Sequence, residues 1–403
     1  MRALRREPPV GGTDEAGWSE ALDFAERARV TLVLRAALLE GGWWDGVPVP
    51  IRRRLDQNLA DNTVRLERLR AAAAEIAERF ADAGVEFVAL KGLSHSPDFI
   101  ADPRLRVQYD LDYYCPREMV GRARDALLAM GYEPTGGWEA YPVDHLPTML
   151  RKTGWQWRGN YFDPELPPAV DLHFRFWDEQ TERLAAPGVE EFWKRREGRE
   201  LELADRLGYA ALHAVRDLLR GDLRLYQIYE IARFLENRNS DAAFWGRWRE
   251  RHAPELRRLE STAFGLAERW FGCRMPEAAE LGPEAAGWLG RYAWSPIEAL
   301  FRPNKYELYL HVSLLRSGRD KWAVAARRLL PLRLPGPVEA VHVPEARMTA
   351  ALRLRRRAKY ATFVISRLLH HARVLAPTLW GWPRWRRTCN GMFTSHRRSP
   401  GLE

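Results

Sequence analysis

Alternation of apolar and polar side chains marks two short segments of this chain as strands. Residues 108–114 read Gln-Tyr-Asp-Leu-Asp-Tyr-Tyr, and residues 170–176 read Val-Asp-Leu-His-Phe-Arg-Phe. Successive side chains of a strand point to opposite faces, so each segment has one polar and one apolar face. Residues 85–90 are mostly apolar and predict a buried strand. A further strand is expected near residues 154–162.

Helical spacing of apolar residues dominates the rest of the chain. One apolar stripe ends at Gly84 and predicts a long helix; its members are Leu55, Leu59, Leu66, Leu69, Ala73, Ile76 and Phe80. The same spacing predicts further helices near residues 18–40, 117–130, 201–219, 225–235, 245–271 and 347–375. The pattern therefore predicts an α+β protein with a small mixed sheet and flanking helices.

The order of these elements suggests four regions. Residues 1–83 form an N-terminal helical region, and residues 84–198 contain the predicted strands. Residues 199–330 form a helical domain. Residues 331–403 hold a linker rich in proline, followed by a basic helix and tail.

Charge is distributed unevenly along the 403 residues. From Arg347 onward there are 13 Lys or Arg and one acid, a surplus of +12, so the preceding residues sum to −3 against the total of +9. A basic end suits an anionic partner: nucleic acid, an acidic lipid surface or a phosphorylated substrate. A basic helix that is simply solvated is an equally open interpretation.

Cysteine is scarce, and its spacing excludes some classes of protein. Cys115, Cys273 and Cys389 are far apart, which argues against a disulfide framework or a thiolate zinc site. Residues 1–9 lack the apolar run of a signal peptide. We therefore expect a cytoplasmic protein, with the basic end allowing a location peripheral to the membrane.

The candidate chemistry begins with Asp110 and Asp112, which share one face of the first alternating strand. Two neighbouring carboxylates repel each other, and a divalent cation with a preference for oxygen ligands, Mg²⁺ above all, would offset that repulsion. Taken alone, the pair is also compatible with an ordinary solvated strand face. Asp171 on the second alternating strand adds the third carboxylate that a two-metal phosphoryl-transfer site requires.

A glycine and two polar residues directly follow the predicted strand 85–90. The sequence there is Lys91-Gly92-Leu93-Ser94. Glycine lets backbone N–H groups approach an anion closely, while lysine adds charge and serine adds a hydroxyl donor. The segment is therefore a candidate phosphate-binding loop.

Four motifs in order give the chain a resemblance to a known family. It is similar to the bacterial "uncharacterised nucleotidyltransferase" group of the DNA polymerase β superfamily. The motifs are Leu90-Lys91-Gly92, Asp102-Pro103-Arg104-Leu105-Arg106, Asp110-Leu111-Asp112 and Asp171-Leu172-His173-Phe174-Arg175. The resemblance implies a polymerase β-like core between N- and C-terminal helical regions. It also implies transfer of a nucleoside monophosphate from an NTP to a small-molecule, peptide or protein acceptor, with release of pyrophosphate.

The resemblance also implies roles for the carboxylates. Asp110 and Asp112 would hold two Mg²⁺ ions, with Mn²⁺ as a substitute. Asp171 would complete the site nearest the acceptor hydroxyl, and would either lower the pKa of that hydroxyl or take its proton. His173 and Arg175, on the Asp171 face, would orient these carboxylates.

The phosphate side of the site is expected to use backbone and cationic groups. Gly92 and Ser94 would hold phosphate oxygens, and Lys91 would add positive charge. Arg106 either reaches phosphate or pairs with Asp102 or an acid of the Asp-x-Asp strand.

Two further histidines and one acid receive no catalytic role. His95 and His213 are interpreted as packed or hydrogen-bonded residues. Glu230 stands where the family usually has an Asp, so no role is assigned to it.

Three alternatives remain open. Leu93 stands where the wider superfamily has a small residue, which is compatible with a pseudoenzyme that binds nucleotide or a partner without catalysis. The aromatic and arginine-rich end is compatible with a terminal nucleotide adder that acts on nucleic acid, or with a helix on an anionic membrane.

Overall fold

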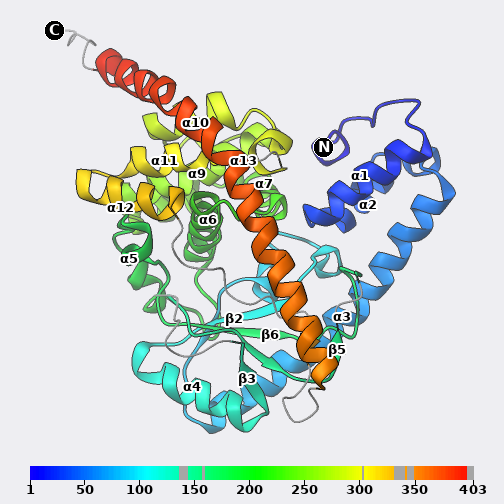
Figure 1. Ribbon diagram of the computed structural model, residues 1–403. Helices are drawn as coiled ribbons and strands as arrows, with labels where there is room; N and C mark the ends of the chain where they lie inside the picture. The colour runs from blue at the N-terminus through cyan, green and yellow to red at the C-terminus, as the bar shows by residue number, and fades with distance from the viewer. Residues whose placement is uncertain (136–143, 157–158, 302–303, 331–340, 343–348, 397–403) are drawn as a thin grey trace.

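The computed structural model describes residues 1–135, 144–156, 159–301, 304–330, 341–342 and 349–396 (Figure 1). A small sheet lies at one end of the molecule and a group of helices lies at the other. The four prolines of the predicted linker, at positions 331, 335, 337 and 344, lie outside the described residues.

Five strands form a mixed sheet in the order β1-β2-β6-β4-β3. The two central strands, β2 and β6, run parallel, and the other pairs are antiparallel. The strands are β1 (Val88–Ala89), β2 (Asp110–Tyr114), β3 (Tyr132–Pro134), β4 (Met149–Arg151) and β6 (Ala169–His173). A separate pair consists of β5 (Trp155–Gln156) and β7 (Val341–His342).

The strands differ from the predicted ones mainly in length. The predicted strand at 85–90 is only β1, because its backbone pairs with β2 over two residues. The strand expected near 154–162 is likewise reduced to β5, and residues 159–162 form a turn or loop. β3 and β4 were not predicted, since neither shows an alternating pattern.

The apolar face of the sheet packs on two helices, α3 (Val49–Asp82) and α4 (Arg117–Ala129). Leu111 and Leu172 of the central strands join Phe80 of α3 and Leu127 of α4 in one buried cluster. The long helix and the helix after β2 were both predicted. Because α3 and α4 cover this face, the aspartate face is turned toward the helical region (Figure 1).

The helical region has its own, larger core. The helices α6 (Leu203–Arg220), α7 (Leu225–Arg238) and α9 (Pro254–Phe271) pack against one another. The helix predicted over 245–271 is wrong as one element, because Pro254 begins α9 and the preceding Ala253 is extended. Around this core lie α5 (Glu179–Glu182), α8 (Ala242–Arg251), α10 (Pro283–Tyr292), α11 (Glu307–Leu314) and α12 (Gly318–Leu329).

The two ends of the chain are also helical. The single helix expected near 18–40 is instead two, α1 (Glu15–Arg27) and α2 (Thr31–Glu40), with Arg29 between them in the left-handed conformation at φ +60°. At the other end, α13 (Ala350–His396) runs from beside β5 across the helical region (Figure 1). Among the described residues, no helix is long and apolar enough to cross a membrane.

Candidate functional site

The three predicted acids lie on one face of the central strand pair. In the parallel register Asp112 is opposite Asp171, and Asp110 is opposite Ala169. Ligand atoms of Asp112, Asp171 and His173 all lie within 4.8 Å of one another. The predicted common face is therefore confirmed. The alternative of an ordinary solvated strand face does not hold for Asp112, which is only 3% exposed.

Asp112 is the most strongly compensated of the three carboxylates. Its Oδ1 atom lies 3.2 Å from the Lys91 ammonium and 3.3 Å from His173 Nε2. Burial alone would raise the pKa of Asp112, but Lys91 and His173 outweigh it and hold that pKa below its usual value. The second oxygen, Oδ2, is buried and has no hydrogen-bond partner among the described residues. This oxygen is free to act as a ligand.

The other two acids have less compensation. Burial, together with the charge of Asp112, raises the pKa of both Asp110 and Asp171. Asp171 accepts one hydrogen bond, from the Thr148 hydroxyl at 2.6 Å. Asp112 and Asp171, together with His173, are close enough to share a divalent cation, which would relieve their repulsion, whereas Asp110 is not part of that group and lines the cavity instead.

Lys91 connects the carboxylates to helix α6. Its ammonium lies 3.1 Å from His213 Nε2 and donates to it. Burial lowers the pKa of Lys91, but Asp112 and Asp110 outweigh burial and raise it, so the lysine stays charged. Burial and the nearby Lys91 lower the pKa of His213 well below its ordinary value, so the imidazole is neutral and can accept this bond.

A second polar cluster surrounds Arg106. Neither predicted ion pair forms there: Asp102 binds Arg104, and the Arg106 guanidinium lies 2.8 Å from Glu230. Glu230 also lies 3.1 Å from His95 Nδ1. Burial would raise the pKa of Glu230, but Arg106 and His95 lower it to about 2. Glu230, to which no role had been assigned, therefore fixes the position of Arg106.

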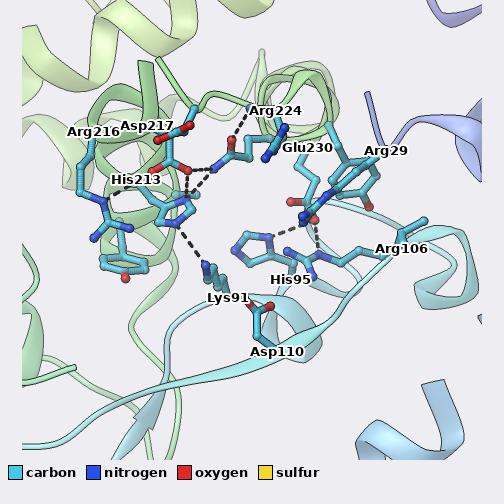
Figure 2. Close-up of a pocket in the computed structure, with 16 residues that line it drawn as sticks. Arg29, Lys91, His95, Arg106, Asp110, His213, Arg216, Asp217, Arg224 and Glu230 are labelled. Atoms are coloured by element: carbon cyan, nitrogen blue, oxygen red, sulfur yellow. Dashed lines mark hydrogen bonds and ion pairs between the residues drawn. The ribbon is translucent and has the colours of Figure 1, made fainter. Parts of the chain in front are cut away.

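A cavity of about 280 Å³ opens between these two clusters (Figure 2). Lys91, Asp110 and His213 form one side, and Arg106 and Glu230 form the other. The remaining lining residues are Arg29, His95, Val107, Tyr209, Ala210, Arg216, Asp217, Asp222, Arg224, Tyr226 and Gln227. The cavity thus joins a carboxylate of the sheet to cations from several parts of the chain.

Two of the lining cations have no ion pair with a carboxylate in the described part of the chain. Arg29 places its guanidinium 4.6 Å above the Tyr109 ring, and burial lowers its pKa. The positive charge of Arg224 contributes to the same lowering. Two cations that repel each other at the edge of a cavity favour an anionic ligand between them.

The predicted phosphate loop is more enclosed than expected. Gly92, at φ +75°, packs so closely against the Gln108 carboxamide that a Cβ atom would collide with it. Ser94 is 3% exposed, and its hydroxyl has no partner among the described residues. Lys91 and Arg106 line the cavity, whereas Gly92 and Ser94 do not.

The predicted supporting residues separate into two groups. His173 contacts Asp112 as expected, and burial lowers the pKa of His173 to about 4 despite that carboxylate. Arg175 lies beyond the end of β6, where its charge acts on Glu190. His95 and His213 are buried or half-buried and hydrogen-bonded, as expected, and they also line the cavity.

Several residues of the site were not predicted. Thr148 immediately precedes β4, and Arg29 comes from the turn between α1 and α2. Neither has a local sequence signal. Arg224, directly before α7, lies on the same segment as Glu230, where the family usually has an Asp, and could have been considered with it.

Comparison with known proteins agrees with this geometry. A family model described as "uncharacterised nucleotidyltransferase" matches residues 14–272. The chain belongs to this family. The match includes the sheet, the three carboxylates and the cavity, and the family description supports a transferase. No curated protein and no solved structure matches the chain.

Proposed function

We propose that this protein transfers a nucleoside monophosphate from an NTP to a hydroxyl group of a small molecule, peptide or protein, and releases pyrophosphate. The observation that carries the proposal is the pairing of Asp112 with Asp171 across parallel strands, with Asp110 on the same face. The family supports the same reaction class. The proposal includes a polymerase β-like core for the five-stranded sheet and the four regions inferred from the sequence.

The carboxylates fit a divalent metal. Asp110, Asp112 and Asp171 would hold Mg²⁺ or Mn²⁺, and the unpartnered Oδ2 of Asp112 offers a buried oxygen for this purpose. When bound, such ions polarise phosphate oxygens and make a hydroxyl a better nucleophile. His173 and Thr148 hold Asp112 and Asp171 in orientation through the contacts at 3.3 and 2.6 Å.

The cavity cations fit the polyphosphate. Lys91 and Arg106 are held in place by Asp112 and Glu230, so their charges are already oriented before a ligand arrives. Arg29 and Arg224 add charge that no carboxylate neutralises by an ion pair in the described chain. Gly92 and Ser94 remain predicted phosphate contacts, although neither lines the cavity.

Asp171 is the proposed acceptor of the hydroxyl proton. Its pKa is raised by burial and by Asp112, which makes it a stronger base than an exposed carboxylate. Thr148 donates to Oδ1 and leaves Oδ2 for the acceptor side.

The test is a transfer assay with each labelled NTP, Mg²⁺ or Mn²⁺, and a cell extract, followed by a mass-spectrometric search for added nucleotidyl mass. The double variant Asp110→Asn/Asp112→Asn should lose transfer. Asp102→Asn is the matched control, because Asp102 pairs with Arg104 away from the strand pair. Wild-type turnover in the double variant would exclude the metal assignment. Tight binding of NTP without any product would identify a pseudoenzyme instead.

A further inference from the structure

Helix α13 is attached to the protein by one of its two apolar faces. Val374, Thr378 and Trp385 are buried against the helical region. The Thr378 carbonyl accepts a hydrogen bond of 2.5 Å from the Tyr309 hydroxyl, and the Trp385 indole donates one of 2.9 Å to Ser313. These contacts fix how the helix is rotated about its axis.

The opposite face of α13 is also apolar, but it faces solvent. Its members recur at three-, four- and eleven-residue intervals, so they form one stripe of the helix. Each of these side chains is between 54% and 78% exposed. They are Leu354, Ile365, Leu368, Leu369, Leu379 and Trp380, and we call them the outer stripe. These exposures show that nothing in the described chain covers the outer stripe.

The charge of α13 restricts what could cover this stripe. The helix contains ten Lys or Arg and no Asp or Glu. A second copy of the helix would bring like charges together, which opposes dimerisation through this face. The phosphates of a nucleic acid would pair with the arginines. Its bases stack on aromatic rings, however, so the exposed leucines and the isoleucine would have no part in binding.

An anionic lipid surface accounts for both properties. Apolar side chains of an interfacial helix enter the boundary between headgroups and acyl chains, while basic residues beside them bind acidic headgroups. Arg373 and Arg384 lie on one flank of the outer stripe and Arg357 and Arg386 lie on the other, by helical spacing. Trp380 is a residue type enriched at this boundary.

We propose that α13 is an interfacial helix whose outer stripe binds the protein to an anionic membrane surface. Because the helix runs from beside β5 to the helical region, binding along its length would hold both the sheet and the helical region at the membrane. The proposal is independent of the transfer reaction, since none of the outer-stripe residues lines the cavity.

Vesicle sedimentation of the full-length protein tests the proposal. The vesicles contain phosphatidylcholine alone or a mixture with phosphatidylserine. We expect binding to the mixed vesicles that weakens with added salt. The triple variant Ile365→Ser/Leu369→Ser/Trp380→Ser should bind at least about tenfold more weakly, because apolar insertion is lost while the charge is retained.

The matched control removes the same number of exposed apolar side chains elsewhere. Val64→Ser/Leu128→Ser/Trp322→Ser changes positions on α3, α4 and α12 that are 41% to 72% exposed, and this variant should bind as wild type does. Circular dichroism and a thermal melt check that both variants fold. Unchanged vesicle binding of the outer-stripe variant would overturn the proposal. A wild-type dimer that the same variant dissociates, or RNA binding in place of vesicle binding, would also overturn it.

Discussion

Asp112 and Asp171 lie directly opposite each other across the parallel strands β2 and β6, and among the described residues only Asp112 is paired with a lysine. Lys91 neutralises Asp112, whereas Asp171 receives a single neutral hydrogen bond from Thr148. The pKa values of the two carboxylates are consequently displaced in opposite directions. Such a difference suits a division of roles between a permanent anion and a proton acceptor.

We first predict that Asp171→Asn separates binding from transfer. The amide is nearly the same size but cannot take a proton, so kcat should fall by about a hundredfold to ten-thousandfold. The dissociation constant for the NTP should change only a few-fold, because the cavity cations are untouched. Single-turnover kinetics and equilibrium binding measure the two effects. Equal loss of binding and transfer would mean that the role of Asp171 is structural.

Thr148 should act through Asp171. Thr148→Val removes the 2.6 Å hydrogen bond with little change in volume, so we expect kcat to fall about tenfold to a hundredfold at constant KM for the NTP. Thr148→Ser keeps the hydroxyl and should restore most of the activity. If the serine variant is as impaired as the valine variant, the hydroxyl is not responsible.

Arg29 is predicted to bind the polyphosphate. Arg29→Gln should raise KM for the NTP about tenfold to a hundredfold, since a charge-assisted contact contributes about 1.5–3 kcal/mol. The effect should be larger for a triphosphate than for a nucleoside monophosphate used as competitor. Arg54→Gln, which removes an arginine that pairs with Asp23 and Glu26, is the control and should leave KM unchanged.

Glu230 should increase the free energy of unfolding at neutral pH, and this contribution should be lost in acid. Its pKa is 4.5 when unfolded and about 2 when folded, so the stabilisation is present above pH 4.5 and is lost as the pH falls through 2. Glu230→Gln leaves Arg106 buried without its partner, and we expect it to lower the free energy of unfolding by about 3–5 kcal/mol. The difference between wild type and variant, measured by denaturant titration, should shrink toward pH 2.

His252 should give the opposite pH dependence. Burial lowers its pKa, but the Glu260 and Asp205 carboxylates, at 2.8 and 3.0 Å, outweigh burial and raise it to about 9. A histidine with an ordinary pKa of 6.5 and a folded pKa of about 9 stabilises the protein below pH 6.5, and this stabilisation is lost as the pH rises through 9.

The measurement for His252 is the free energy of unfolding from pH 6 to pH 10. The wild type should lose up to about 3 kcal/mol from this residue over that range. His252→Gln should be less stable at pH 6 and should show a flatter profile. A variant with the wild-type slope would show that another group titrates.

The sequence was sufficient to place the aspartates, because alternation alone decides which side chains of a strand share a face. Asp110, Asp112 and Asp171 needed only the further assumption that their strands are neighbours, and β2 and β6 do pair. Chemistry that depends on contacts between distant segments could not be predicted. Arg106 meets Glu230 across 124 positions, and nothing local to either residue indicates the other.

Backbone hydrogen bonding limited the prediction of strands for the same reason. β1 is short because its partner β2 pairs with only two of its residues, a property of the assembled sheet. Thr148 was missed because it precedes a three-residue strand, β4, which is too short to show a period. Pro254, by contrast, did carry a local signal, and the break between α8 and α9 could have been predicted from it.

The wall of basic residues around the cavity has a practical consequence for fragments of this protein. Arg29, Arg106 and Arg224 belong to an N-terminal turn, the approach to β2 and the start of α7. A fragment limited to residues 84–198 would retain all three aspartates yet lose two of these three arginines. Even if the sheet folded, such a fragment would bind an anionic substrate more weakly than the 403-residue chain does. Activity measured on the fragment would therefore underestimate the activity of the longer chain.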